Sequence, residues 1–205
     1  MKISFLTSVM NRTHHLKQTY LQNIDCCVRN NNKNCELEFV LLNYNSSDDL
    51  TEYVKKNIRP RCSHVKFNYI ENTNALYYDM SLTKNILGKT AGGDILCWLD
   101  ADNFVYENFV EFVYESFSND ENIIMNVEFS TKTSGMCGRL VSTKKHFIEI
   151  GGYDQDMNGW GYEELDFVNR SIKYGKRKIN IPFKFLGKLN HSEEERIKNY
   201  EDSYT

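Results

Sequence analysis

The chain has 205 residues, a length that suits one sizeable α/β domain or a tight pair of small ones. Apolar residues make up 40% and charged residues 26%, which are ordinary proportions for a globular domain. A formal net charge of -3 leaves no basic excess for a phosphate backbone, which argues against a nucleic-acid-binding protein.

The N-terminal stretch and the cysteines argue against several other classes. Met1–Leu6 is apolar, but polar Asn11 and Arg12 follow too soon for a signal peptide or a membrane span. The six cysteines form no CxxC pair, and Cys97 falls inside an expected core strand, which argues against a structural zinc site or a disulfide framework. We therefore expect reduced thiols, a cytoplasmic location and no membrane anchor of the chain's own.

The first half of the chain alternates between apolar strands and amphipathic helices. Its patterns predict strands over 3–9, 37–42, 64–72 and 94–100, and helices over 11–24, 46–58 and 81–91. Pro60 is expected to end the second helix. Such alternation predicts an α/β fold with a largely parallel, open sheet and helices on both faces. The runs FVLL and ILCWL are continuously apolar, as strands covered on both faces should be.

The second half is less regular. Its patterns predict a helix over 109–117, a strand over 123–129, a strand and a short helix within 134–154, and a last strand over 177–183. A glycine-flanked loop at 159–162 enters a helix that ends at Gly175, with Leu165, Val168 and Ile172 as its apolar stripe. The charged tail after His191 is expected to be helical or frayed.

Two acids follow the fourth predicted strand at once, in the segment LCWLDADN. Strand alternation places Asp100 and Asp102 on one side, with Ala101 facing inward. Neighbouring carboxylates repel each other, and a divalent ion with oxygen ligands would remove that conflict. The alternative is a solvated acidic turn that caps the next helix. Polar residues also follow Val9 and Leu42, where two other predicted strands end. In a parallel sheet the polar residues after all three strands would lie at the same edge, which is the edge where ligands bind.

A second group of acids follows a tryptophan between glycines, in GWGYEELDF (159–167). The helix dipole favours acids at a helix start, which gives Glu163, Glu164 and Asp166 a structural explanation. A purely structural explanation is weaker for Trp160. The glycines on either side lose much backbone entropy on folding, and they offer the indole ring no side chain to pack against. An indole on such a loop suits stacking against the apolar face of a sugar. A nearby carboxylate that stays ionised near neutral pH suits a general base.

With these motifs the sequence resembles the inverting glycosyltransferases of the GT-A fold. LDADN resembles their DxD motif, and GWGYEELDF resembles the GWGxEDxD motif of the β-1,4-galactosyltransferases and bacterial chondroitin polymerases. MNRTHHLKQT (10–19) resembles the FRNRxxHL segment of the galactosyltransferases, and 81–103 resembles the family-2 pattern of a helix, then GD, then DxD. The resemblance spans 7–191. It implies a single domain with one Rossmann-like, mostly parallel sheet, a nucleotide-sugar-binding half at 1–103 and an acceptor-binding half at 104–205.

The same resemblance implies roles for particular residues. Asp100 would hold the nucleotide, and Asp102 with His191 would bind a Mn²⁺ or Mg²⁺ ion that bridges the donor diphosphate. An imidazole among oxygen ligands favours Mn²⁺, whereas the alternative for His191 is a surface histidine. Glu164 would be the catalytic base. The other assigned residues are Thr7, Arg12, Asn43 and Lys84 for the nucleotide, and Trp160, Glu163 and Asp166 for the acceptor or for bracing the site.

Three positions depart from the pattern of that family. Glu164 stands where the galactosyltransferases have Asp, which lengthens the base by one methylene. Leu165 replaces an acid, so one acceptor contact is expected to be absent. Asn43 stands where an acid often meets the nucleobase, which weakens the expectation of a UDP-sugar.

The resemblance implies a metal-dependent, inverting transfer of a hexosyl or N-acetylhexosaminyl group from a nucleoside-diphosphate sugar to a hydroxyl of a glycan or other acceptor, as in polysaccharide biosynthesis. One alternative is a non-catalytic nucleotide-sugar-binding protein with the same fold. A nucleotidyltransferase is less favoured, because TSVMNRTHH lacks a glycine-rich phosphate loop after the first strand. The sugar, the linkage and the oligomeric state are not readable from the sequence.

Overall fold

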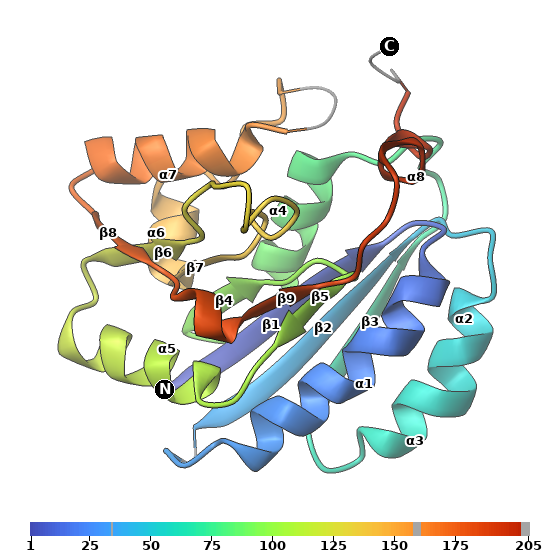
Figure 1. The fold of residues 1–205 in the computed structure, drawn as a ribbon, viewed down its shortest axis with the longest axis horizontal. Coiled ribbons are helices and arrows are strands. Elements are labelled where there is room, and N and C mark those ends of the chain that lie inside the picture. Colours follow the sequence, from blue (N-terminus) through green and yellow to red (C-terminus); the bar gives the residue numbers. More distant parts are fainter. Residues whose placement is uncertain (34, 158–160, 202–205) are drawn as a thin grey trace.

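The structure is a computed structural model that describes residues 1–33, 35–157 and 161–201. Its main feature is a seven-stranded sheet in the order β3-β2-β1-β4-β7-β6-β8 (Figure 1). The strands of this sheet run parallel except β7, which is antiparallel to both of its neighbours. The strands are β1 (Lys2–Val9), β2 (Glu36–Tyr44), β3 (Lys66–Asn72), β4 (Ile95–Trp98), β6 (Ile123–Asn126), β7 (Leu140–Thr143) and β8 (Arg177–Asn180).

Helices cover both faces of this sheet (Figure 1). One face packs against α1 (Thr13–Arg29), α5 (Phe109–Asn119) and a helical segment made of α2 (Leu50–Tyr53), the π-helical turn η1 (Val54–Ile58) and α3 (Arg59–Arg61). The other face packs against α4 (Met80–Thr90), α6 (Lys144–Glu149) and α7 (Glu163–Lys173). The predicted α/β fold with a mostly parallel sheet flanked by helices is therefore confirmed. Within the described ranges, no helix has both the length and the apolar character needed to cross a bilayer.

Alternating side chains of the strands build one apolar core on each face of the sheet. Phe5 of β1 faces the first core, where its ring stacks on Phe39 with the centroids 5.3 Å apart. Leu6, the next residue, faces the second core. Trp98 of β4 is buried in this second core against Tyr153, with the ring centroids 5.5 Å apart. Successive strand residues point to opposite faces, so strands covered on both sides are apolar throughout.

The C-terminal part of the chain returns to the first half. β5 (Asn103–Val105) pairs antiparallel with β9 (Leu186–Lys188), which follows the short 3-10 helix η2 (Phe183–Phe185). Figure 1 shows these two strands side by side, although their residues are far apart in the sequence. The chain then continues into α8 (Glu193–Ile197), so part of the tail is helical, as expected.

Two local predictions were wrong. Pro60 does not end the second predicted helix, which continues to Arg61. The π-helical turn before it widens the backbone ahead of a residue that lacks an N–H group and crowds the preceding turn. The predicted apolar stripe of α7 is also wrong, because Leu165 and Ile172 are 52% and 45% exposed.

The buried face of α7 follows instead from its first residue. Glu163 is buried, and Phe167 and Ser171 are buried with it at successive intervals of four residues. Residues four apart share one face of a helix, so a buried carboxylate at position 163 turns Leu165 outward. The partner that makes this burial possible lies on α4 and belongs to the candidate site.

Candidate active site

A cleft of about 720 Å³ opens at the carboxyl-terminal edge of the parallel strands. The ends of β1, β4 and β6 form its floor, and the first turn of α7 and the segment after His191 contribute to its walls. Among the described residues, the polar side chains that line it are Ser8, Arg12, Tyr78, Asp100, Asp102, Asn126, Glu128, Ser134, Tyr162, Glu163, Glu164, Lys178, His191, Asn199 and Tyr200. The cleft therefore joins the two acidic motifs of the sequence.

Asp100 lies in this cleft just after β4. A Cβ atom at position 138 would lie 2.2 Å from Asp100 Oδ2, so Gly138 makes room for the carboxylate. The pKa of Asp100 is raised to about 6, chiefly by burial and also by the charges of Asp102 and Glu163, whereas Lys84 and Arg139 oppose the shift. No described residue donates a hydrogen bond to this carboxylate or forms an ion pair with it.

Asp102 is paired with His191. Asp102 Oδ2 and His191 Nε2 share a hydrogen bond of 2.7 Å, and the two side chains are 14% and 6% exposed. Asn103 Nδ2 donates to Asp102 Oδ1 at 2.7 Å. Burial disfavours the charged form of Asp102, but the hydrogen bonds from His191 and Asn103 outweigh it, so its pKa lies below the ordinary value. The bond to Asp102 in turn raises the pKa of His191.

Asp102 and His191 could together hold a divalent cation. Asp102 offers a carboxylate oxygen, the ligand type that Mg²⁺ and Mn²⁺ prefer, and His191 adds an imidazole nitrogen, whereas the Asp100 carboxylate does not complete a compact group of three ligands with them. The Asp102–His191 hydrogen bond joins two atoms that would both be ligands, and a cation would take the place of their proton. The structure brings the predicted metal residues together, and metal binding itself stays a prediction.

On the other side of the cleft, two glutamates share one lysine. Lys84 Nζ of α4 lies 2.9 Å from Glu163 Oε1 and also donates to Glu164 Oε1. The side chains of Lys84, Glu163 and Glu164 are only 4%, 3% and 15% exposed. Paired charges of this kind are stable in an interior only when each has a partner. One ammonium group cannot fully neutralise two carboxylates.

The two glutamates therefore titrate differently. Burial disfavours ionisation of Glu163, but Lys84 outweighs it and holds the pKa of Glu163 below its ordinary value. Burial raises the pKa of Glu164 to about 8; Lys84 opposes this shift, and the charge of Glu163 adds to it. The sequence predicted a base that is ionised near neutral pH, whereas this shift favours the protonated form of Glu164 there, and its role as the base stays a prediction. A pKa near the working pH still suits a group that accepts and releases protons.

Three predicted nucleotide residues do not line the cleft. Thr7 is buried and its hydroxyl donates to the Leu99 carbonyl at 2.9 Å. Asn43 is also buried, and its amide donates to the hydroxyl of Tyr69 at 3.0 Å. Lys84 lies beneath the lining, where it pairs with the glutamates. Lys84 thus supports the helical wall of the cleft, whereas Thr7 and Asn43 bond to residues that do not line it.

The remaining predicted residues have mixed placements. Arg12 lines the cleft, and its guanidinium donates to the main-chain carbonyl of Glu195. Asp166 accepts from Arg170 Nε at 2.7 Å and does not line the cleft, which matches the bracing role and not the acceptor contact. Trp160 lies outside the described residues.

Several residues of the cleft were missed from the sequence. Asn199 Nδ2 donates to the Met10 carbonyl at 2.8 Å, and Tyr78 N donates to the Asn199 carbonyl at 2.7 Å. The ring of Tyr200 meets that of Tyr78 edge-on, with the centroids 5.6 Å apart. No local motif marks these contacts, because their partners are more than a hundred residues apart.

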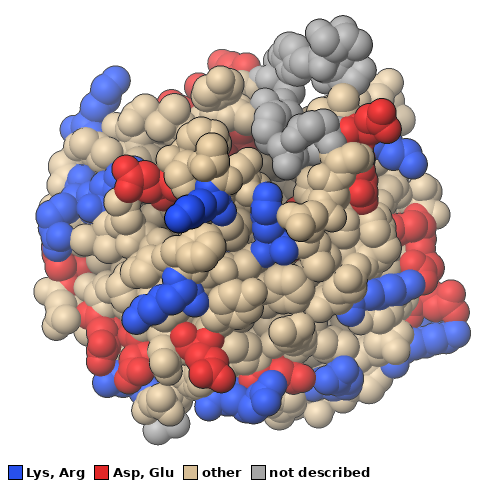
Figure 2. All heavy atoms as spheres, in the orientation of Figure 1, with Lys and Arg blue, Asp and Glu red and all other residues tan. Residues whose placement is uncertain are grey.

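Charges of both signs are interspersed on the face of the molecule that Figure 2 shows. Lysine and arginine side chains alternate there with aspartate and glutamate side chains, and they form no continuous basic strip on that face. This distribution agrees with the net charge of -3 and gives a phosphate backbone no docking surface on that side.

A family model and several solved structures are similar to this chain. The model described as the N-terminal domain of galactosyltransferase matches residues 123–195, which run from β6 to α8 and include Glu163, Glu164 and His191. No curated protein matches the sequence.

The solved structures show the fold. TarS from S. aureus (residues 1–349) has a TM-score of 0.71 at 10% identity, over 91% of this chain and 59% of that one. GalNAc-T7, solved with UDP, GalNAc and Mn²⁺, has 0.73 at 14% identity, over 93% and 44%. The mannosyltransferase PcManGT from Pyrobaculum calidifontis, solved with GDP-Man and Mn²⁺, has 0.70 at 13% identity, over 90% and 55%. The chain thus has the GT-A fold that its motifs predicted, and it spans about half the length of these proteins.

Proposed function

We propose that this protein is a metal-dependent, inverting glycosyltransferase that moves a sugar from a nucleoside-diphosphate donor, a UDP-sugar by preference, to a hydroxyl of a glycan or another acceptor. One observation carries the proposal: a single cleft holds Asp100, Asp102 and His191 at its strand edge and Glu164 at its helical wall. The galactosyltransferase model that matches 123–195 supports it. The fold shared with TarS, which was solved with UDP and with UDP-GlcNAc, also supports it.

The charges of the cleft explain why such a donor needs a metal. Asp100, Asp102, Glu163 and Glu164 line it, whereas Lys84 lies beneath the lining and is already paired. A diphosphate is itself an anion and would be repelled by these acids. A Mn²⁺ or Mg²⁺ ion held by Asp102 and His191 would neutralise the departing diphosphate oxygens.

Glu164 carries the proton transfer in this proposal. It accepts the proton of the acceptor hydroxyl while the oxygen forms its bond to the anomeric carbon of the donor. The bond from that carbon to the phosphate oxygen breaks on the opposite face, so the product has the inverted configuration. Lys84 keeps Glu163 ionised and fixed beside the base.

The proposal is tested by offering the protein a panel of nucleotide sugars with and without Mn²⁺. A true donor should raise the melting temperature only with the metal, because ligands that bind the folded state stabilise it by mass action. The same donor should be slowly hydrolysed, and with an acceptor it should give product of inverted anomeric configuration. Stabilisation without hydrolysis or transfer would identify a binding protein, and retained configuration would refute the single displacement.

A further inference from the structure

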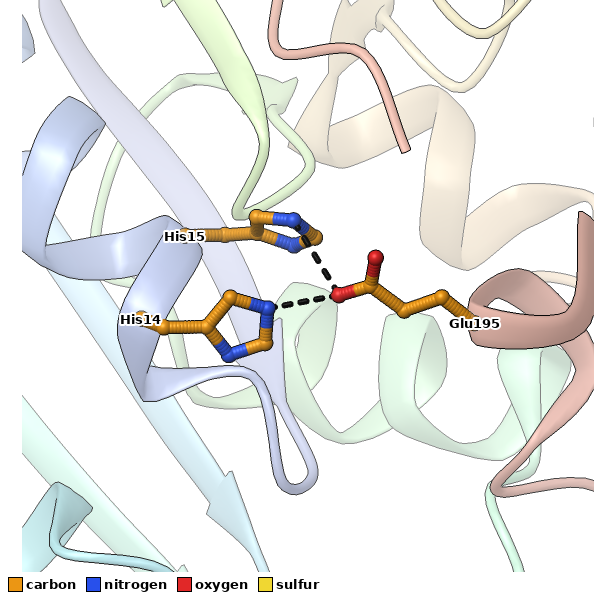
Figure 3. Close-up of side chains that lie close together, drawn as sticks. All are labelled: His14, His15 and Glu195. Atoms are coloured by element: carbon orange, nitrogen blue, oxygen red, sulfur yellow. Dashed lines mark hydrogen bonds and ion pairs between the residues drawn. The ribbon is translucent and has the colours of Figure 1, made fainter. Parts of the chain in front are cut away.

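A second group of metal-ligating side chains lies outside the acids of the cleft. His14 and His15 stand in the first turn of α1, and Glu195 stands on α8. Figure 3 shows both imidazole rings and the carboxylate of Glu195 directed at one another. One carboxylate oxygen, Glu195 Oε1, lies 2.6 Å from His14 Nε2 and 3.3 Å from His15 Nε2. One ligand atom from each of the three residues lies within 4.8 Å of the other two.

These separations are close to those around a bound transition metal. Zinc bonds to histidine nitrogen and carboxylate oxygen are about 2.0–2.2 Å long, so two ligands of a tetrahedral ion are about 3.3–3.5 Å apart. The 3.3 Å contact of His15 already meets that spacing. The 2.6 Å contact of His14 needs a shift of less than an ångström, and its side chain is 57% exposed and free to move.

We propose that His14, His15 and Glu195 bind a zinc ion, at a site separate from Asp102 and His191. Two imidazoles and one carboxylate are a zinc donor set, whereas Mg²⁺ and Mn²⁺ favour sites of oxygen ligands.

The burial of His15 also bears on the site. His15 is 4% exposed, and its Nε2 atom faces Glu195 Oε1 at 3.3 Å, which is longer than an ordinary hydrogen bond. A metal ion bound at Nε2 would give this buried nitrogen a close partner. Arg12 donates to the main-chain carbonyl of Glu195 and so leaves the side-chain carboxylate to the two histidines.

The position of the site gives the ion a role. His14 and Glu195 are 181 residues apart, and the ion would fasten α8 to the start of α1. Asn199 and Tyr200 follow α8 directly and line the cleft. Zinc would therefore hold the C-terminal wall of the cleft in place, next to His191, whose ring centroid lies 5.3 Å from that of His15.

Calorimetric titration of the chelator-treated full chain with Zn²⁺ tests the site, and it needs no sugar. We expect saturable binding of one zinc ion per chain, and the same binding in Asp102→Asn, which removes a ligand of the other site. His14→Gln and Glu195→Gln should each weaken zinc binding by more than the about 10–100-fold that loss of an outer-shell partner costs. Glu194→Gln, an exposed acid on the same helix, is the matched control and should bind as the parent does.

Cobalt supplies a second measurement. Co²⁺ in the parent should show the intense visible absorption of a tetrahedral ion with nitrogen ligands, and Glu195→Gln should lose it while its melting curve stays cooperative. Zinc binding that is absent, that survives Glu195→Gln, or that disappears in Asp102→Asn would overturn the proposal. A protein that binds zinc but transfers no sugar would leave this site standing and refute only the proposed activity.

Discussion

Two pairs of acids face each other across the cleft, and they handle their charge differently. Asp100 and Asp102 follow β4; Asp102 bonds to His191 and Asn103, and Asp100 forms no ion pair with a described residue. Glu163 and Glu164 begin α7, and the buried Lys84 bonds to both. The strand pair thus has a histidine that can lose its proton as its partner, whereas the helix pair has a lysine inside the fold.

This difference separates two tasks that carboxylates perform. An acid whose partner is a histidine can exchange the proton between them for a metal ion, which suits metal binding. An acid pair that shares one ammonium group holds a single surplus proton at neutral pH, and that suits a group that exchanges protons. The same residue type serves both tasks because the neighbours, not the carboxylates, set the charge.

Removal of the internal cation should have the largest effect. Lys84→Met leaves Glu163 and Glu164 buried without a counter-charge, and removing one partner of a buried pair costs about 3–5 kcal/mol of unfolding free energy. Urea unfolding measures the loss. Lys89→Met, an exposed lysine on the same helix, is the control and should change stability little. Equal stability of the two variants would show that the buried ion pair is not needed.

Removal of the proposed base should affect turnover and not the fold. Glu164→Gln keeps the shape of the side chain and abolishes its basicity, so turnover should fall by about 10²–10⁴-fold with donor binding intact. Steady-state kinetics with calorimetry of the donor measure the two effects. Asp166→Asn alters an acid in the same helical turn and should lose at most about 1 kcal/mol of stability. Near-normal turnover in Glu164→Gln would exclude it as the base.

Substitution of an acid in the strand pair, Asp100 and Asp102, should change metal affinity. Asp102→Asn removes a charged ligand, so Mn²⁺ affinity in the presence of nucleoside diphosphate should fall by more than about 10–100-fold. Calorimetry with and without Mn²⁺ measures this change, and Asp120→Asn, which alters an exposed acid paired with Arg177, is the control. Unchanged Mn²⁺ binding in Asp102→Asn would move the metal site elsewhere.

The contrast between the pairs also shows what the sequence could predict. The position of these acids at the sheet edge was predictable, because parallel strands share one carboxyl-terminal edge. Strand alternation did not place them, since β4 ends at Trp98 and the chain turns between Asp100 and Asn103. Apolar runs likewise predicted the sheet. The role of Asp102 needed His191, which is 89 residues away, and a family motif supplied that pairing.

The helix pair was only half predictable. The motif indicated Glu163 and Glu164, but no spacing rule joins them to Lys84, which the sequence assigned to the nucleotide. That long-range ion pair allowed Glu163 to be buried and so turned the apolar stripe of α7. Burial, together with the charge of Glu163, raises the pKa of Glu164 to about 8 against the effect of Lys84. Thr7 and Asn43 were predicted to contact the nucleotide, but both bond within the protein. A polar side chain at the end of a strand can face a ligand or bond to a neighbouring residue, and the sequence alone does not distinguish the two cases.

The pH dependence of activity and of stability is the smallest of the expected effects, and it tests the helix pair, Glu163 and Glu164. Glu164 must lose its proton to act as a base, so with a pKa of about 8 we expect kcat/KM to rise about tenfold per pH unit below that value and to level off above it. Stability should follow the opposite trend. The folded protein binds this proton more tightly than the unfolded chain, whose value is near 4.5, so the stabilisation from Glu164 is lost as the pH rises through about 8. Urea midpoints and kcat/KM across this range measure both trends, and Glu164→Gln should remove that part of the stability change. If kcat/KM is flat between about pH 6 and 8, the surplus proton does not reside on the group that performs the chemistry.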